Sequence, residues 1–413
     1  MKTSIRIQLM IMMFLQFFIW GSWYGQMSKY LLSPAVNATG DQVGNAYTSF
    51  SIANIIAPFF VGMIADRFFS AQKVMGVLNL LGAVILFSLT QVKDGGTFFW
   101  YILAYTLTFA PTLALSNAIA MRQMESPEKQ FPSIRVLGTI SWIVVTNIVG
   151  FLNAGDKVLI FQISMITSVI LGIYCFFLPD TPPKAKGSKT TFAQIVGSDA
   201  FVLFKDRSYL IFFIASVLIC IPLSFYYSLA NPSLTDSNMT NVENKMSLGQ
   251  ASEVFFLLIL PLFYSRFGVK KMLLIGLIAW IIRFVCFGYG DALTTEWILM
   301  IGILLHGICF DFFFVTGQIY TDNKAGERIK ASAQGLITLA TYGVGMGIGS
   351  KLSGIVLDMY KTGTDATGKA IYNWQGVWMV PTVIAIAVLI LFLLFFKDES
   401  KRVKPVEKVE QMA

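Results

Sequence analysis

The sequence predicts an all-α membrane protein with twelve transmembrane helices arranged as two six-helix pseudo-repeats. Three observations lead to this fold class. The 413 residues are 55% hydrophobic and only 13% charged, whereas a soluble domain carries about 25% charged residues. Apolar stretches long enough to cross a bilayer, about 20 residues each, recur along the whole chain. A polar segment rich in Pro and Lys interrupts them near the midpoint.

The apolar stretches define the expected spans, which short polar loops separate. We place these spans at roughly 8–32, 44–65, 73–93, 97–121, 132–153, 157–178, 209–230, 247–265, 271–290, 296–319, 331–357 and 376–396. Most of the 31 Lys and Arg residues fall in alternate loops. The opposite loops hold only Lys29, Lys93, Lys157, Lys245, Lys361 and Lys369. Because Lys and Arg are enriched in cytoplasmic loops, we expect an even number of spans and two cytoplasmic termini.

The polar segment near the midpoint is expected to be a cytoplasmic linker between two six-helix halves. The expected order is a first half, a linker, a second half and a cytoplasmic tail, at residues 1–178, 179–208, 209–396 and 397–413. A faint internal repeat supports this division, because basic residues around Arg67 and Arg266 occupy equivalent loops of the two halves. Two halves related by a repeat are typical of secondary transporters.

Several other classes of protein are disfavoured. The net charge of +8 is explained by cytoplasmic loops, so we expect no nucleic-acid partner. The four Cys residues lie in apolar runs, without a Cys-x-x-Cys pair or a His cluster, so we expect no disulfide and no metal site. The chain has no Walker A sequence and no nucleophile–base motif. We therefore expect neither an enzyme nor a bound cofactor.

Ionisable residues deep inside a span are costly and are often functional. Arg135, Thr139 and Trp142 follow one another at i, i+4 and i+7 in the fifth span, so they share a helical face. A guanidinium, a hydroxyl and a large aromatic ring together suit a polar, planar solute. The alternative is an Arg that extends to the headgroups while Trp142 faces lipid.

The eighth, ninth and tenth spans also carry such residues. Gln250 and Glu253 are three residues apart in the eighth span and share a face. Glu253 suits a proton carrier because burial disfavours its charged form; the alternative is a fixed ion pair with an Arg. His306, the only histidine, suits a proton relay or a neutral packing role. Asp311 is expected to pair with Arg283, either structurally or as part of the coupling machinery.

Polar, aromatic and small residues also mark the first, seventh, tenth and eleventh spans. Ser224 and Tyr227 are three residues apart in the seventh span, and Phe310 lies one turn after His306 in the tenth. The first span is dense in aromatic residues around Trp20, which is deep for an interfacial belt. The eleventh span is rich in glycine, which permits close helix contact. A transporter interface that rocks needs the same feature, so the glycines do not decide between the two explanations.

Together these residues resemble the nucleoside:proton symporter family of the major facilitator superfamily. The resemblance runs along nearly the whole chain. It rests on the runs Leu15–Trp23, Phe131–Ile140, Asp199–Lys205, Gln250–Glu253, Phe310–Phe313 and Ala331–Gly335. The loop with Gly62, Asp66 and Arg67 resembles the gating-loop motif of the superfamily, although Phe69 and Ser70 stand where that motif has Gly.

The resemblance implies a central site for a nucleoside and a proton. The substrate contacts of the family map to Arg135, Thr139, Trp142, Gln250, Glu253 and Phe310. We add Ser224, Tyr227 and His306 as candidate substrate contacts of this chain. For proton coupling we expect Glu253, with Asp311 or His306 assisting. Four residues, on the fifth, seventh and tenth spans, depart from the family. Trp142 stands where Phe is frequent, Ser224 and Tyr227 where amides are expected, and His306 where Tyr occurs.

We therefore expect proton-coupled nucleoside uptake by alternating access. The expected location is the bacterial inner membrane, where the chain would work as a monomer with nucleoside, protons and lipid as its partners. A sugar or glycoside symporter, or a small-molecule exporter, of the same fold is the alternative.

Overall fold

The computed structural model describes residues 2–60, 69–182, 197–366 and 368–397. The predicted gating-loop residues Asp66 and Arg67 lie outside these ranges. The helices of the first half are α1 (Thr3–Trp23), α2 (Met27–Leu32), α3 (Gly40–Phe60), α4 (Ala71–Leu89), α5 (Gly95–Arg122), α6 (Pro127–Phe151), α7 (Leu159–Tyr174) and the 3₁₀ turn η2 (Cys175–Phe177). A second 3₁₀ helix, η3 (Ser198–Lys205), lies in the expected linker.

The rest of the chain is also mainly helical. Its elements are α9 (Arg207–Asp236), α10 (Val242–Tyr289), α11 (Glu296–Leu304), α12 (His306–Phe310), η4 (Asp311–Val315), α13 (Thr316–Thr338), η5 (Leu339–Gly345), α14 (Met346–Met359), β1 (Lys361–Thr364), β2 (Ala370–Tyr372) and α15 (Trp374–Phe395). Both η4 and η5 are π-helical turns. The short antiparallel hairpin of β1 and β2 was not predicted.

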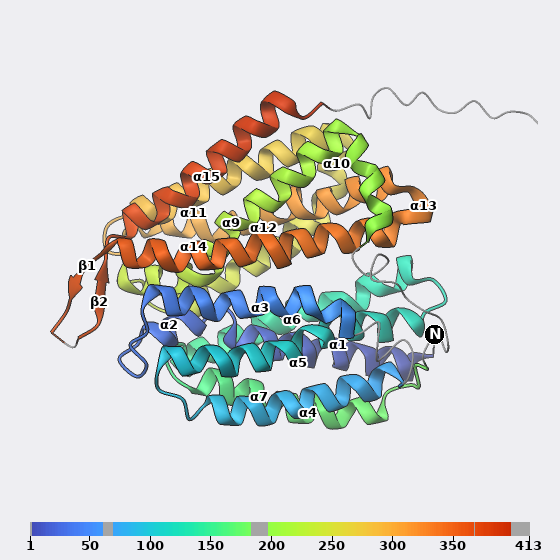
Figure 1. The fold of residues 1–413 in the computed structure, drawn as a ribbon, viewed down its shortest axis with the longest axis horizontal. Helices are drawn as coiled ribbons and strands as arrows, with labels where there is room; N and C mark the ends of the chain where they lie inside the picture. The colour runs from blue at the N-terminus through green and yellow to red at the C-terminus, as the bar shows by residue number, and fades with distance from the viewer. Residues whose placement is uncertain (1, 61–68, 183–196, 367, 398–413) are drawn as a thin grey trace, which may run out of the picture.

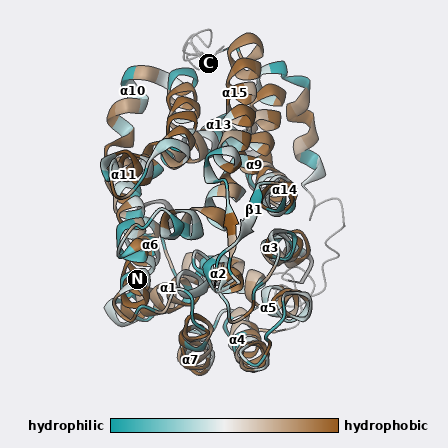
Figure 2. Ribbon diagram, turned by 90° about the vertical axis from the view of Figure 1, so that its left-hand side faces the viewer, coloured by the Kyte–Doolittle hydropathy of each residue, from teal (hydrophilic) through white to brown (hydrophobic). Residues whose placement is uncertain are grey.

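Helices α1 to α7 form one group and helices α9 to α15 form a second (Figure 1). Helix α3 of the first group lies beside α14 of the second (Figure 1). Hydrophobic residues predominate on the helices of both groups (Figure 2). The two groups follow one another in sequence, and the chain passes between them through the segment that was expected to be the linker.

The outer surface carries large apolar side chains, which fits lipid rather than water as the solvent. Phe151 is 78% exposed, Leu258 75% and Leu262 70%. A water-soluble monomer rarely exposes large continuous apolar patches. In the described part of the chain, nine helices are long and apolar enough to cross a membrane. The chain is a multi-pass membrane protein.

The span count is consistent with the predicted twelve. Helix α10 has 48 residues and contains Gly268 with φ 71° and ψ 174°, so it comprises two spans joined at a kink. Gly326, with φ 64° and ψ 176°, similarly breaks α13 between the tenth and eleventh expected spans. A positive φ of this kind is open to glycine but strained for other residues. Helix α3 supplies the second expected span.

The two groups are joined at the end of the molecule that carries α2 and the β1–β2 hairpin, which we call the hairpin end. Asp358 of α14 accepts hydrogen bonds at 2.7 Å from the backbone N–H groups of both Gly40 and Asp41, at the start of α3. A carboxylate at a helix N-terminus is stabilised by the unpaired N–H groups and the helix dipole. Lys351 of α14 also forms an ion pair with Asp41.

A second set of polar contacts joins α2 and α6 to α10 at the same end. Lys29 forms an ion pair with the buried Glu243 at 2.7 Å. Asn244 donates a hydrogen bond to the Asn147 side chain at 2.8 Å, and Asn147 donates one to Ser247 at 2.9 Å. Breaking a buried ion pair costs about 3–5 kcal/mol. The hairpin end is therefore held shut by both charged and neutral contacts.

The opposite end, which carries residues 179–182 and η3, is called the linker end. Here several hydrogen bonds and ion pairs join elements of the same group of helices. Gln72 donates to Asp180 at 2.7 Å in the first group, and Lys270 donates to the Phe396 carbonyl at 2.9 Å in the second. Lys324 forms an ion pair with Asp206. These contacts hold each group together at the linker end, whereas the contacts at the hairpin end join one group to the other.

Helices α3 and α14 pack with almost no side chain between them. A Cβ added at Gly44 would lie 2.6 Å from the Ser350 carbonyl oxygen, and one at Gly354 would lie 2.3 Å from the Gly40 carbonyl oxygen. These separations are below van der Waals contact. The close helix contact predicted from the glycines of the eleventh span is confirmed at Gly354.

Replacing Gly44 with Ala is expected to open the hairpin end. Overpacking at this contact costs about 1–3 kcal/mol, which shifts a conformational equilibrium roughly five- to 150-fold. Spin labels at the exposed positions Asp156 and Thr294, one in each half, would report a longer mean distance. Gly96→Ala is the matched control, because a Cβ there would meet no atom closer than 3.5 Å. Unchanged distances in the Gly44 variant would contradict this account of the contact.

Candidate functional site

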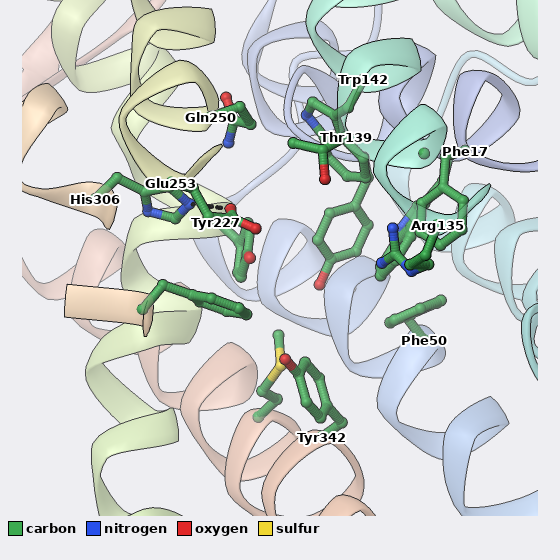
Figure 3. A pocket seen from close by; sticks show the side chains of 15 residues that line it. Phe17, Phe50, Arg135, Thr139, Trp142, Tyr227, Gln250, Glu253, His306 and Tyr342 are labelled. Atoms are coloured by element: carbon green, nitrogen blue, oxygen red, sulfur yellow. Dashed lines mark ion pairs between the residues drawn. The ribbon is translucent and has the colours of Figure 1, made fainter. Parts of the chain in front are cut away.

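A cavity of about 730 Å³, including the part open to solvent, lies between the two groups of helices. Ligand pockets typically measure about 300–1,000 Å³ and combine apolar walls with a few polar groups. Figure 3 shows the side chains that line this one. They are Phe17, Trp20, Tyr24, Phe50, Arg135, Gly138, Thr139, Trp142, Tyr227, Gln250, Glu253, His306, Phe310, Tyr342 and Met346.

Helix α6 provides the polar face that the sequence predicts. Arg135, Thr139 and Trp142 all line the cavity (Figure 3). The Arg135 Cζ atom lies 4.0 Å from the ring centroid of Phe17, which is a cation–π contact. No hydrogen bond or ion pair joins this guanidinium to another described residue. Arg135 therefore points into the cavity rather than toward headgroups, and its donors are available to a ligand.

Helix α10 contributes Gln250 and Glu253 from the facing side (Figure 3). Glu253 is the one carboxylate among the residues that line the cavity. Its Oε2 atom lies 3.5 Å from Nε2 of His306. In the part of the chain that the structure describes, Glu253 forms no ion pair with an Arg, so the fixed Arg pairing that the sequence left open is not observed.

His306 and Phe310 begin and end the short helix α12, and both line the cavity. The His306 side chain is only 1% exposed. Its Nδ1 atom lies 2.9 Å from Nη1 of Arg283. The sequence prediction that Arg283 pairs with Asp311 is therefore wrong. Both residues lie on facing spans, as predicted, but α12 brings the imidazole and not the carboxylate to the guanidinium.

Two residues predicted to be functional lie outside the cavity. Ser224 is buried, and its hydroxyl lies 3.0 Å from the carbonyl oxygens of both Cys220 and Met346. This serine holds α9 against α14 and makes no direct contact with the cavity, which corrects the expectation that it touches substrate. Asp311 is buried in the π-helical turn η4, and no described residue forms a hydrogen bond with its Oδ2 atom.

The structure adds lining residues that sequence reasoning did not select. The aromatic density of the first span was a usable signal, because Phe17, Trp20 and Tyr24 all reach the cavity. Tyr342 and Met346 gave no such signal, since they stand among the glycines of the eleventh span. Their position follows from the packing of η5 and α14 against the first half.

Aromatic side chains close the cavity on the side of the hairpin end. Trp142, Tyr227 and Gln250 line both the central cavity and a second, smaller one that also touches Gly25 and Thr146. Tyr24 of the first half meets Tyr227 of the second with ring centroids 5.4 Å apart. A ligand that enters from the hairpin end would have to displace this layer.

Two helix bundles that enclose a central cavity and are joined at the hairpin end define a secondary transporter of the major facilitator fold. The chain matches the family described as nucleoside H+ symporter over residues 1–401. It is 40% identical to the putative nucleoside transporter YegT of Escherichia coli, with 98% of this chain and 97% of that one covered. It is 35% identical to the xanthosine permease of the same organism, with 95% and 96% covered.

The solved structures agree with the sequence relatives. The crystal structure of the nucleoside transporter NupG matches with a TM-score of 0.85 and 31% identity, covering 96% of this chain and 100% of that chain. The chain belongs to the nucleoside:proton symporter family. The fold and the family predicted from the sequence are confirmed, and the protein is a transporter and not an enzyme.

Proposed function

We propose that this protein takes up nucleosides together with protons, and that both bind in the central cavity. The observation that carries this proposal is the composition of the cavity wall. Arg135, Thr139 and Gln250, whose side chains have no hydrogen-bond partner among the described residues, face a single carboxylate, Glu253, across a space walled by aromatic rings. A nucleoside presents one planar base and one hydroxyl-rich sugar, which need these two kinds of surface.

Each lining residue has a role in this proposal. Arg135, Thr139 and Gln250 hydrogen-bond the ribose and the polar edge of the base. Trp142, Tyr227 and Phe310 enclose the base, since aromatic rings stack at small conformational cost. Glu253 takes the proton, and His306 lies beside it. Asp311 assists coupling from outside the cavity, and the loop with Asp66 and Arg67 takes part in gating.

The proposed orientation indicates to which side of the membrane the cavity is closed. The loop charges favour a cytoplasmic location for both termini and the linker end. In this proposal the chain lies in the bacterial inner membrane and works as a monomer. The hairpin end then faces outward. Its contacts, Asp358 with α3 and Lys29 with Glu243, close the cavity to the outside in this conformation. Uptake requires that these contacts break and re-form in each cycle.

A ligand screen separates nucleosides from the alternative class of solute. A ligand at 100 times its Kd stabilises the folded protein by about 2.7 kcal/mol, which raises the temperature of unfolding. Uridine, adenosine and xanthosine are expected to do so for the purified protein, whereas maltose and simple glycosides are not. If sugars stabilise the protein and nucleosides do not, its substrates are sugars and the proposal of nucleoside uptake is wrong.

A further inference from the structure

Arg283 is a cation enclosed within the second half, without a carboxylate partner among the described residues. Its side chain is 0% exposed. The guanidinium lies over the ring of Tyr226 at 3.6 Å and near those of Trp280 and Phe287 at 5.5 and 5.6 Å. Its Nε and Nη2 atoms find no hydrogen-bond partner in the part of the chain that the structure describes. A buried charge is costly unless it is compensated, so this residue calls for an explanation.

The contact that Arg283 does make fixes the chemistry of His306. Nη1 of Arg283 and Nδ1 of His306 are 2.9 Å apart. A guanidinium only donates hydrogen bonds, so Nδ1 must accept and cannot carry a proton. The ring is then neutral, with its proton on Nε2. That N–H faces Oε2 of Glu253 at 3.5 Å.

We infer that Arg283 is a positioning residue of the proton site: it holds His306 as the neutral Nε2–H tautomer, which engages Oε2 of Glu253 and leaves Oε1 to bind the transported proton. The inference rests on the proposed function. His306 orients the acid and does not itself carry the proton. With the proton on Oε1, Glu253 offers the substrate a donor; without it, Glu253 offers only acceptors.

Other titratable groups surround this pair without altering the assignment. The ring of Tyr226 lies 5.3 Å from that of His306. The groups close enough to interact electrostatically with Glu253 include Arg135, Tyr227, Asp311 and Tyr342. Among the described residues, only Arg283 hydrogen-bonds Nδ1 of His306. The tautomer is therefore set by one contact, which a single substitution can remove.

The chain contains one histidine, so its imidazole can be observed without assignment. Protein labelled with ¹⁵N-histidine and purified by a tag that lacks histidine is expected to show one protonated ring nitrogen, Nε2. This signal should stay unchanged between about pH 5 and pH 8, where an ordinary histidine titrates. A wild-type ring that becomes doubly protonated in this range, or that carries its proton on Nδ1, overturns the inference.

Two variants test the role of Arg283 itself. Arg283→Met removes the donor, so the ring is expected to titrate within the same pH range. Arg283→Lys keeps a cationic donor and is expected to restore the single tautomer. A Met variant that folds and keeps the wild-type spectrum contradicts the inference. If the Met variant does not fold, the wild-type spectrum still tests whether His306 is held as the neutral Nε2–H tautomer.

Uptake measurements distinguish this inference from the proposed function. In Arg283→Met, the pH profile of nucleoside uptake should gain a second titrating group, which Arg283→Met combined with His306→Gln should remove. A titrating wild-type ring overturns the inference and leaves nucleoside transport standing. Absence of nucleoside uptake by the wild type overturns the proposed function, while the spectrum still decides the tautomer that Arg283 sets.

Discussion

Replacing Glu253 with Gln is expected to abolish accumulation of nucleoside against its gradient while leaving exchange intact. Glutamine keeps the size of the side chain and an oxygen that can accept from His306, but it cannot bind a proton reversibly. One pH unit is worth about 1.36 kcal/mol per proton, which supports roughly tenfold accumulation with one proton per nucleoside. In the variant this ratio should fall to about one in proteoliposomes with the same imposed gradient.

The controls for this prediction separate coupling from folding. Counterflow of labelled uridine against internal uridine needs no net proton movement, so it should persist in the Gln variant. Glu296→Gln removes an acid that pairs with Lys245 away from the cavity, and it should accumulate nucleoside like the wild type. If Glu253→Gln still accumulates nucleoside tenfold, Glu253 is not the proton carrier.

Replacing Arg135 with Met is expected to weaken nucleoside binding about ten- to 150-fold. A hydrogen bond to a charged group is worth about 1.5–3 kcal/mol, and each 1.4 kcal/mol is about tenfold in Kd. Methionine keeps the contact with Phe17 but offers no donor. Isothermal titration of the purified variant with uridine or adenosine would measure the change.

Two further substitutions sharpen this test. Arg135→Lys keeps the charge but loses the planar fork, so its affinity should lie between those of the wild type and the Met variant. Arg207→Met removes an Arg that lies against Phe395 outside the cavity, and it should bind nucleoside normally. Unchanged affinity in Arg135→Met would remove this residue from the proposed binding site.

Sequence periodicity could predict which faces of α6 and α10 reach the cavity. Arg135, Thr139 and Trp142 share a face because a helix fixes their angular spacing, and the same holds for Gln250 and Glu253. The cost of placing polar groups in an apolar span then indicated that these faces turn inward. Both inferences need only local geometry, which is why the structure places all five residues in the cavity.

Contacts between spans were beyond the reach of the sequence. Arg283 could meet either Asp311 or His306, and the choice depends on the start of α12 at His306 and the π-helical turn that follows it. Ser224 lies three residues from Tyr227, yet it hydrogen-bonds the backbone of α9 and α14. Tyr342 lines the cavity from η5, where the neighbouring Gly343 packs against Ile55 of α3.

The most direct test of proton-coupled nucleoside uptake uses the wild-type protein in proteoliposomes. An imposed pH gradient, acidic outside, is expected to drive labelled uridine or adenosine to about tenfold accumulation per pH unit for one proton per nucleoside. A protonophore should return the ratio to about one. Accumulation that persists with the protonophore, or uptake that does not respond to the gradient, would contradict proton coupling.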